Sequence, residues 1–290
     1  MRHLMLYSSL MFTLVCTFGS ANAQSCGGSN NSDEKGVNER KAFIAKIKPV
    51  LIDSADKSGT SIGIDYDIDY LCSLGSRKRT SAGQPTVTVK ETDVLITEGE
   101  IAARLRGTLA SSKEKNPNKF VDLSAAGYYV MSRTEYWSRF GGGLTYETDQ
   151  GFENKQFSFG LNAAASKMSI LQNGDAGSLF LNLARVNPNK DAARKAAEGH
   201  LSPFNRWNFE ASYTINTNQE KLPSIDFNYR HYKEISPTIA IKSAGLDRNR
   251  IGLIRFNLEK GFFAQYSRGS LPFDEKSVRA IKIGWTGKFE

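Results

Sequence analysis

The stretch VRAIKIGWTGKF, from Val278 to Phe289, alternates between two kinds of residue. Successive side chains of a β-strand point to opposite faces of the sheet. One face of this segment therefore carries Ile281, Ile283, Trp285, Gly287 and Phe289, and the other carries Ala280, Lys282, Gly284, Thr286 and Lys288. The pattern predicts a strand with one face suited to lipid and the other to water.

Similar segments recur from Thr60 onward, each with a period of two and separated by turn residues. In the first, Ile62, Ile64, Tyr66, Ile68 and Tyr70 share one face, and Asp65, Asp67 and Asp69 share the other. Carboxylates are costly in a dry core but natural beside water. We predict about twelve strands: this one and those near 85–96, 100–110, 119–131, 135–147, 154–165, 177–187, 206–216, 223–233, 250–259, 261–269 and 278–289.

The terminal segment resembles the closing strand of bacterial outer-membrane β-barrels, which usually ends in an aromatic residue, although here Glu290 follows Phe289. The repeated alternating segments are also typical of that class. The resemblance covers Thr60 to Phe289 and implies an all-β fold, a closed antiparallel transmembrane β-barrel. It also implies the outer membrane of a Gram-negative bacterium as location. Implied partners are the barrel-assembly machinery, outer-membrane lipid and lipopolysaccharide.

Connections of alternating length support a barrel, since such proteins have short periplasmic turns and longer external loops. Leu74 to Gln84 is long, Thr97-Glu98-Gly99 is tight, and Ser111 to Asn118 is long again. Medium-length connections at 166–176 and 217–222 are exceptions. The segment Pro237 to Ser243 could add a strand, giving thirteen or fourteen in all.

The N-terminal residues are typical of a secretory signal peptide. Arg2 and His3 precede an apolar run from Leu4 to Phe18, and Ala21-Asn22-Ala23 suits cleavage after residue 23. An alternative interpretation is a lipid-modified Cys26 on a flexible tether. No later segment approaches the ~20 apolar residues of a spanning helix, which argues against a helical membrane protein.

Residues 24–58 are expected to form a polar spacer and an amphipathic helix, and residues 59–290 the barrel. The helix is predicted from about Val37 to Asp56, because apolar residues recur there at spacings of three and four. It would plug or cap the barrel, lie on the membrane with Lys41, Lys46 and Lys48 outward, or pack against the barrel. Cys26 and Cys72 are the cysteines left after the signal peptide, so a disulfide scaffold is excluded. They either form one bridge or stay unpaired.

The polar faces of the predicted strands suggest what lines the interior. Although the formal net charge of the chain is +8, acidic and basic candidates nearly balance, which argues against a strongly anion-selective porin. The two signs either lie on opposite walls of a narrow pore or pair into a network that fills the interior. The candidates are Asp65, Asp67, Asp69, Asp122, Glu147, Glu210 and Asp226, with Arg104, Arg106, Arg139, Arg230, Arg255 and Lys282.

A narrow pore for small polar solutes, or a component of envelope export, is the function we expect. An enzyme at the lipid interface is the second hypothesis, since His231 would face lipid near a strand end, while His200 lies in a loop. No catalytic residue is assigned, and no metal or cofactor motif is found. A structural or adhesive barrel and a secreted soluble β protein also remain.

The positions of aromatic and basic residues indicate which parts of the chain could contact lipid. Aromatic residues lie mostly near segment ends, as in the interfacial girdles of membrane barrels. The basic run Arg77-Lys78-Arg79 is placed in an exterior loop, where it either contacts the sugars and phosphates of the outer leaflet or is simply solvated. Nucleic acid is not an expected partner, and the sequence leaves the oligomeric state open.

Overall fold

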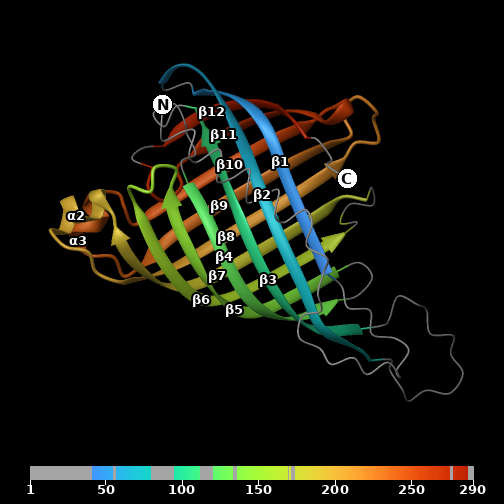
Figure 1. The fold of residues 1–290 in the computed structure, drawn as a ribbon, viewed down its shortest axis with the longest axis horizontal. Helices are drawn as coiled ribbons and strands as arrows, with labels where there is room; N and C mark the ends of the chain where they lie inside the picture. The colour runs from blue at the N-terminus through green and yellow to red at the C-terminus, as the bar shows by residue number, and fades with distance from the viewer. Residues whose placement is uncertain are drawn as a thin grey trace, which may run out of the picture. The chain divides into compact units, whose positions relative to one another are not determined.

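The computed structural model describes residues 41–54, 57–79, 95–111, 120–132, 136–168, 170, 174–274 and 277–286. These residues form a closed barrel of antiparallel strands, in which each strand pairs with its neighbours in sequence and β12 pairs with β1 (Figure 1). The strands are β1 (Lys41–Ser54), β2 (Lys57–Arg79), β3 (Leu95–Ala110), β4 (Phe120–Ser132), β5 (Tyr136–Asp149), β6 (Lys155–Met168), β7 (Ala176–Lys190), β8 (Phe204–Asn216), β9 (Ser224–Ile235), β10 (Arg248–Asn257), β11 (Phe262–Gly269) and β12 (Val278–Trp285).

The predicted fold class, an all-β closed antiparallel barrel of about twelve strands, is confirmed. In β12, Ile281 and Ile283 are half exposed while Ala280 and Lys282 are buried, as the alternation predicts. The same rule holds elsewhere on the outer wall, where Leu161 is 70% exposed. Most of the large apolar side chains on the strands therefore point outward. Among the described residues, no helix is long and apolar enough to cross a membrane.

The predicted helix from Val37 to Asp56 is wrong where it can be compared, because Lys41–Ser54 is the strand β1, which closes the barrel. The helical spacing arose because both faces of this strand carry apolar residues. Leu51 points outward and is half exposed, whereas Val50 and Ile52 are buried inside against Phe263. A strand that is apolar on both faces loses the period of two. The barrel therefore begins before residue 59.

The first predicted loop and turn are also wrong. Strand β2 continues past Leu74 to Arg79, and Thr97-Glu98-Gly99 lies inside β3. The predicted strand 85–96 falls outside the described residues except for 95–96, which belong to β3. Strand β1 is a strand that the sequence did not predict. Arg77-Lys78-Arg79 consequently ends β2 at the end of the barrel where β1 begins and β12 ends.

The other end of the barrel carries two short helices, and we call it the helix end. Helix α2 (Ala192–Glu198) is capped by Asp191, whose side chain accepts from the Arg194 amide. Helix α3 (Ile239–Ser243) shows that the possible extra strand at Pro237 to Ser243 is wrong. The two helices lie side by side beyond the strands (Figure 1), and the Thr238 hydroxyl donates to Glu198.

The remaining connections at the helix end include residues 270–277 between β11 and β12. At the opposite end, the short 3₁₀ turn η2 (Glu259–Gly261) joins β10 to β11. The left-handed backbone of Lys260 and Gly261 makes this turn tight.

The closing seam joins the first and last strands. Val50 pairs with Gly284 of β12, and Gly284 pairs in turn with Phe263 of β11. The ring of Phe263 lies over Gly284, so that a Cβ on this glycine would come within 2.6 Å of the ring. The absence of a side chain at residue 284 thus lets the aromatic ring fill the inside of the seam.

Several predicted features lie outside the described residues: the signal peptide (1–23), the tether with Cys26, and the terminal Phe289. Cys72 on β2 is disulfide-bonded. The other cysteines of the chain, Cys16 and Cys26, are not among the described residues.

Candidate functional site

The barrel interior holds the candidate residues, and contacts between strands that are not neighbours show that these side chains point inward. Arg106 of β3 donates to Glu210 of β8 at 3.0 Å. Lys282 of β12 reaches Asp65 of β2 at 2.7 Å, across β1. Such pairs can meet only through the interior. The other candidates lie on the same face of their strands as these residues.

The carboxylates of β2 pair with the neighbouring strand. Arg104 donates two hydrogen bonds to Asp67, with Nε–Oδ1 and Nη2–Oδ2 distances of 2.9 and 2.8 Å. The same guanidinium lies 3.3 Å from Asp69. This two-pronged geometry is the strong form of an arginine–carboxylate pair. It also holds both aspartates against the wall of β3.

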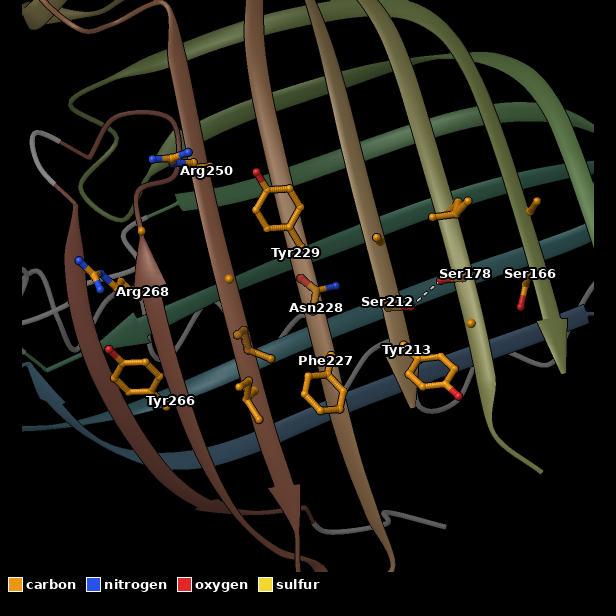
Figure 2. Close-up of a pocket in the computed structure, with 18 of the residues that line it drawn as sticks. Ser166, Ser178, Ser212, Tyr213, Phe227, Asn228, Tyr229, Arg250, Tyr266 and Arg268 are labelled. Atoms are coloured by element: carbon orange, nitrogen blue, oxygen red, sulfur yellow. Dashed lines mark hydrogen bonds between the residues drawn. The ribbon is translucent and has the colours of Figure 1, made fainter. Parts of the chain in front are cut away.

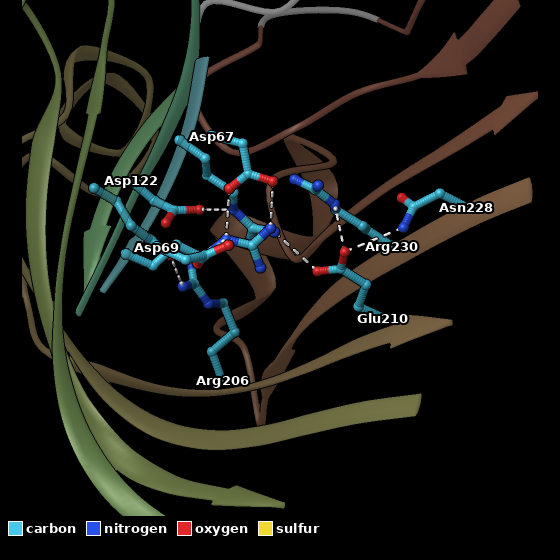
Figure 3. A network of polar contacts seen from close by, with 10 residues as sticks. Asp67, Asp69, Asp122, Arg206, Glu210, Asn228 and Arg230 are labelled. Atoms are coloured by element: carbon cyan, nitrogen blue, oxygen red, sulfur yellow. Dashed lines mark hydrogen bonds and ion pairs between the residues drawn. The ribbon is translucent and has the colours of Figure 1, made fainter. Parts of the chain in front are cut away.

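A second group crosses the barrel (Figure 3). Arg106 pairs with Asp122 of β4 through its Nε and with Glu210 through its Nη1. Glu210 is also 3.3 Å from Arg230 and accepts from Asn228 at 3.1 Å. Opposite charges therefore bridge two walls of the barrel at this level.

Two further carboxylates are held by neutral groups or a lysine. Asp65 accepts from Lys282 and from the Thr108 hydroxyl at 2.6 Å. Asp226 accepts from Thr214 at 2.9 Å and from Asn257 at 2.8 Å. Asp226 makes no ion pair with any residue that the structure describes.

Arg139 and Glu147 lie nearer the two ends of the interior. Arg139 is 3.2 Å from Glu100 and stacks over Tyr128, with 4.4 Å between its guanidinium carbon and the ring centroid. Towards the helix end, Glu147 accepts from Arg206 at 2.5 Å. Gln156 donates to the same carboxylate at 2.5 Å. Most of the predicted interior charges therefore form ion pairs. A paired network is one of the two arrangements that the sequence allows.

Sequence reasoning missed several interior charges. Arg206 shares the face of Glu210 on β8 and could have been found from that alternation. Glu100 likewise shares the face of Arg104 on β3. Lys46 and Lys48 were missed because their segment was interpreted as a helix. Both point inward from β1 and line an interior cavity.

That cavity, which we call the cationic chamber, has a volume of about 260 Å³. Its lining includes two carboxylates, Asp65 and Asp67, but six cations, Lys46, Lys48, Arg106, Arg230, Arg255 and Lys282. Three of these cations, Lys46, Lys48 and Arg255, form no ion pair with a described residue. Although the interior as a whole is balanced, this part of it is strongly positive.

Arg255 illustrates how the unpaired cations are accommodated. Its guanidinium donates to the neutral oxygen of Gln265 at 3.0 and 2.6 Å. It also lies over the Phe263 ring at 4.6 Å, and the Lys48 ammonium lies 5.5 Å from the same ring. Neutral hydrogen bonds and ring faces stabilise these charges without cancelling them. The chamber therefore keeps a positive potential.

A second interior cavity, also of about 260 Å³, is electrically balanced. Four arginines and four carboxylates contribute to its lining. These are Arg104, Arg106, Arg139 and Arg230, with Asp69, Asp122, Glu147 and Glu210. Arg106 and Arg230 belong to the linings of both cavities, so the two spaces adjoin.

An apolar group, which we call the mouth cluster, narrows the interior at the helix end. It consists of Phe120, Tyr232, Ile251 and Leu271, with Phe273 packed against them. Leu271 and Phe273 belong to the β11–β12 connection, and the Phe120 and Phe273 rings are 6.3 Å apart. Three members of the cluster also line the cationic chamber. The connection therefore folds over one end of the chamber.

His231, the candidate for interfacial catalysis, lies on the outer wall. Its ring stacks on Trp207 with 4.9 Å between centroids, and its Nδ1 is 3.2 Å from the Tyr229 hydroxyl. Among the described residues, neither a carboxylate nor a serine is in contact with it. His200 is exposed beyond α2, where its ring contacts the Glu198 carbonyl. Within the described part of the chain, no three potential metal ligands cluster together.

Comparison with known proteins adds the following. No family model matches the chain, and no curated protein does. Among solved structures, it is similar to the NanC porin, at 8% identity and a TM-score of 0.45, over 85% of this chain and all of that one. OmpT, an outer-membrane protein of Vibrio cholerae, is 9% identical with a TM-score of 0.41, over 85% of this chain and 97% of the other.

A third similar structure is OccD1 (OprD), at 11% identity and a TM-score of 0.35, over 88% of this chain and 97% of that one. The predicted class, a bacterial outer-membrane β-barrel, is thus the class of the solved structures that this barrel resembles. No narrower family is indicated.

Proposed function

We propose that this protein is an outer-membrane β-barrel that acts as a narrow pore for small anionic solutes. The outer wall supports the membrane placement, because a wall that exposes many leucine, isoleucine and phenylalanine side chains is costly in water. Leu144, Phe159 and Leu161 are each exposed by more than half on neighbouring strands. Soluble proteins rarely expose contiguous apolar surface on this scale. A soluble secreted barrel is therefore the weaker alternative.

The cationic chamber is the observation that supports passage of anions. Cations that lack ion-pair partners inside a low-dielectric wall attract counter-ions. Lys46, Lys48 and Arg255 form no ion pair within the described part of the chain, and they face a space large enough for a small carboxylate or phosphate. Rings of basic side chains serve the same purpose in anion-selective pores. The paired charges elsewhere would stiffen the wall and keep the path narrow.

Conductance across a planar bilayer tests the proposal. The purified barrel should give small channels whose reversal potential in a salt gradient indicates preference for chloride over potassium. The triple variant Lys46→Gln, Lys48→Gln and Arg255→Gln should lose that preference. A matched control is Lys167→Gln with Lys260→Gln, which also removes cations but from the outer wall and a turn.

Two results would contradict the pore. If the folded wild-type barrel conducts no ions, a structural or adhesive role becomes the better account. If the triple variant conducts with unchanged selectivity, the chamber is not on the ion path. The enzymatic alternative has its own test, since His231→Ala should abolish release of fatty acid from labelled phospholipid only if that histidine is a general base. The Trp207 and Tyr229 contacts of His231 do not favour catalysis.

A further inference from the structure

The charged residues on the outer face of β9 to β12 are unevenly distributed. Every charged side chain that points outward from these four strands is a cation within three residues of the helix end. Towards the opposite end the same faces carry Phe227, Ile254, Tyr266, Ile281 and similar residues. We call the cations the basic rim: Lys233, Arg248, Arg250, Arg268 and Arg279.

A hollow in the wall lies beside the basic rim (Figure 2). It has a volume of about 1400 Å³ and extends over the outer face from β6 to β11. One row of paired residues explains it, because Ala211 pairs with Tyr229, Tyr229 with Gly252, and Gly252 with Arg268. The small residues in this row leave the space open. A Cβ placed on Gly252 would have no atom within 4 Å.

The sides of the hollow are apolar and its upper edge is basic. Figure 2 shows the rings of Tyr213, Phe227 and Tyr266 around it, with Arg250 at the edge nearest the helix end and Arg268 at the side. Neither arginine makes an ion pair with a described residue, whereas Arg248 is 3.3 Å from Asp247. The surface therefore offers space for hydrocarbon beside guanidinium groups that are available for an anion.

We propose that this surface binds one molecule of lipopolysaccharide, with a phosphate of its lipid A headgroup on the basic rim and an acyl chain in the hollow. The planar fork of arginine matches phosphate oxygens. Neighbouring strands are about 4.8 Å apart, so the rim from β10 to β12 spans roughly 10 Å. A headgroup with two phosphates on a disaccharide fits that width better than a phospholipid with one phosphate. The proposal rests on the outer-membrane placement above, and it requires that the helix end faces outward.

Native mass spectrometry of the detergent-purified barrel, titrated with diphosphorylated lipid A, tests the inference. The double variant Arg250→Gln and Arg268→Gln should bind lipid A roughly thirtyfold more weakly, because each basic residue at an anionic lipid surface contributes about a fivefold factor. The matched control Lys221→Gln with Lys260→Gln removes two cations from turns at the opposite end, outside the hollow. It should bind like the wild type.

A second variant addresses the hollow. Gly252→Leu should fill it without a clash, since the space above this residue is open. Affinity for acylated lipid A should then fall, while affinity for the same headgroup with its acyl chains shortened should change less. Heat-modifiable gel mobility shows whether each variant is folded.

The outcomes separate the two proposals. A protein that fractionates as soluble contradicts the outer-membrane placement and this inference together. A folded barrel whose Arg250→Gln, Arg268→Gln variant binds lipid A like the wild type contradicts this inference alone. Equal binding of phosphatidylglycerol and lipid A, with equal loss in the variant, would also overturn it, because the rim would then be a general anionic-lipid surface.

Discussion

Arg106 and Glu210 meet across the barrel interior with 3.0 Å between Nη1 and Oε2, although 104 residues separate them in the chain. Their strands, β3 and β8, lie on different walls of the barrel. The pair therefore holds two walls together at a level where no backbone hydrogen bond can. It also occupies space that an open pore would leave to water.

Removal of this cross-wall carboxylate should destabilise the barrel. Glu210→Gln leaves Arg106 and Arg230 with less compensation in a mostly buried setting, so the free energy of unfolding should fall by about 1–3 kcal/mol. Urea titration of the barrel folded into vesicles measures it. Asp226→Asn is the control, because Asp226 is held by neutral donors, and it should cost less. Equal losses of unfolding free energy in the two variants would show that the ion pairs of Glu210 stabilise the barrel no more than neutral hydrogen bonds do.

A change of charge should harm assembly on the outer face of β2 but not on its inner face. Ile64→Arg places a cation on the lipid face and should cost up to about 2–4 kcal/mol near the membrane midplane. Asp67→Asn should leave assembly nearly intact, since Asp69 remains beside Arg104. Heat-modifiable gel mobility after folding into vesicles measures the folded fraction of each variant. Equal tolerance of the two changes would contradict the assignment of faces.

The mouth cluster should limit conductance. Leu271→Ala with Phe273→Ala removes the two side chains of the β11–β12 connection that pack on Phe120, and single-channel conductance should rise. Leu258→Ala, in the turn at the opposite end, is a control of the same chemistry. Unchanged conductance in the double variant would place the narrowest point elsewhere.

The seam should tolerate no side chain at Gly284. Gly284→Leu would drive a branched chain into the Phe263 ring and the Pro49 carbonyl, both within 2.6 Å of the new Cβ. The fraction of heat-modifiable barrel should fall sharply. Gly127→Leu is the matched change, because a Cβ there meets no atom within 4 Å. Assembly of both variants alike would mean that the ring moves aside.

The sequence predicted the parts of the fold that depend on a period of two. Strand β12 was recognised because its outer face is apolar while its inner face carries Lys282. Strands β4 to β11 alternate as well, although residues such as Phe120 and Phe263 add apolar side chains to the inner face. Strand β1 was not, because Val50 and Ile52 pack inside while Leu51 packs outside. Local pattern cannot distinguish such a strand from a helix. The extent of β2 and β3 was also missed, since turn-forming residues such as Thr97-Glu98-Gly99 are tolerated inside paired strands.

The sequence predicted which charged residues face the interior, but not which of them form ion pairs. Alternation identified Arg106 and Glu210 as inward-facing, but which acid meets which base depends on how the barrel closes. The cationic chamber depended on Lys46 and Lys48, and therefore on the strand that was missed. The wall hollow could not be predicted either, since it arises from the register that brings Ala211, Tyr229 and Gly252 into one row.

The β1–β12 seam also constrains how the molecule can form. Val50 and Gly284 lie near opposite ends of the barrel sequence, so a growing chain that lacks its final strand carries two bare sheet edges. Bare edges invite pairing with other chains. Contacts between such distant residues are also slow to form, because the chain loses loop-closure entropy before the contacts stabilise it. A partly synthesised chain therefore cannot close the barrel, and closure has to wait until strand β12 has been made.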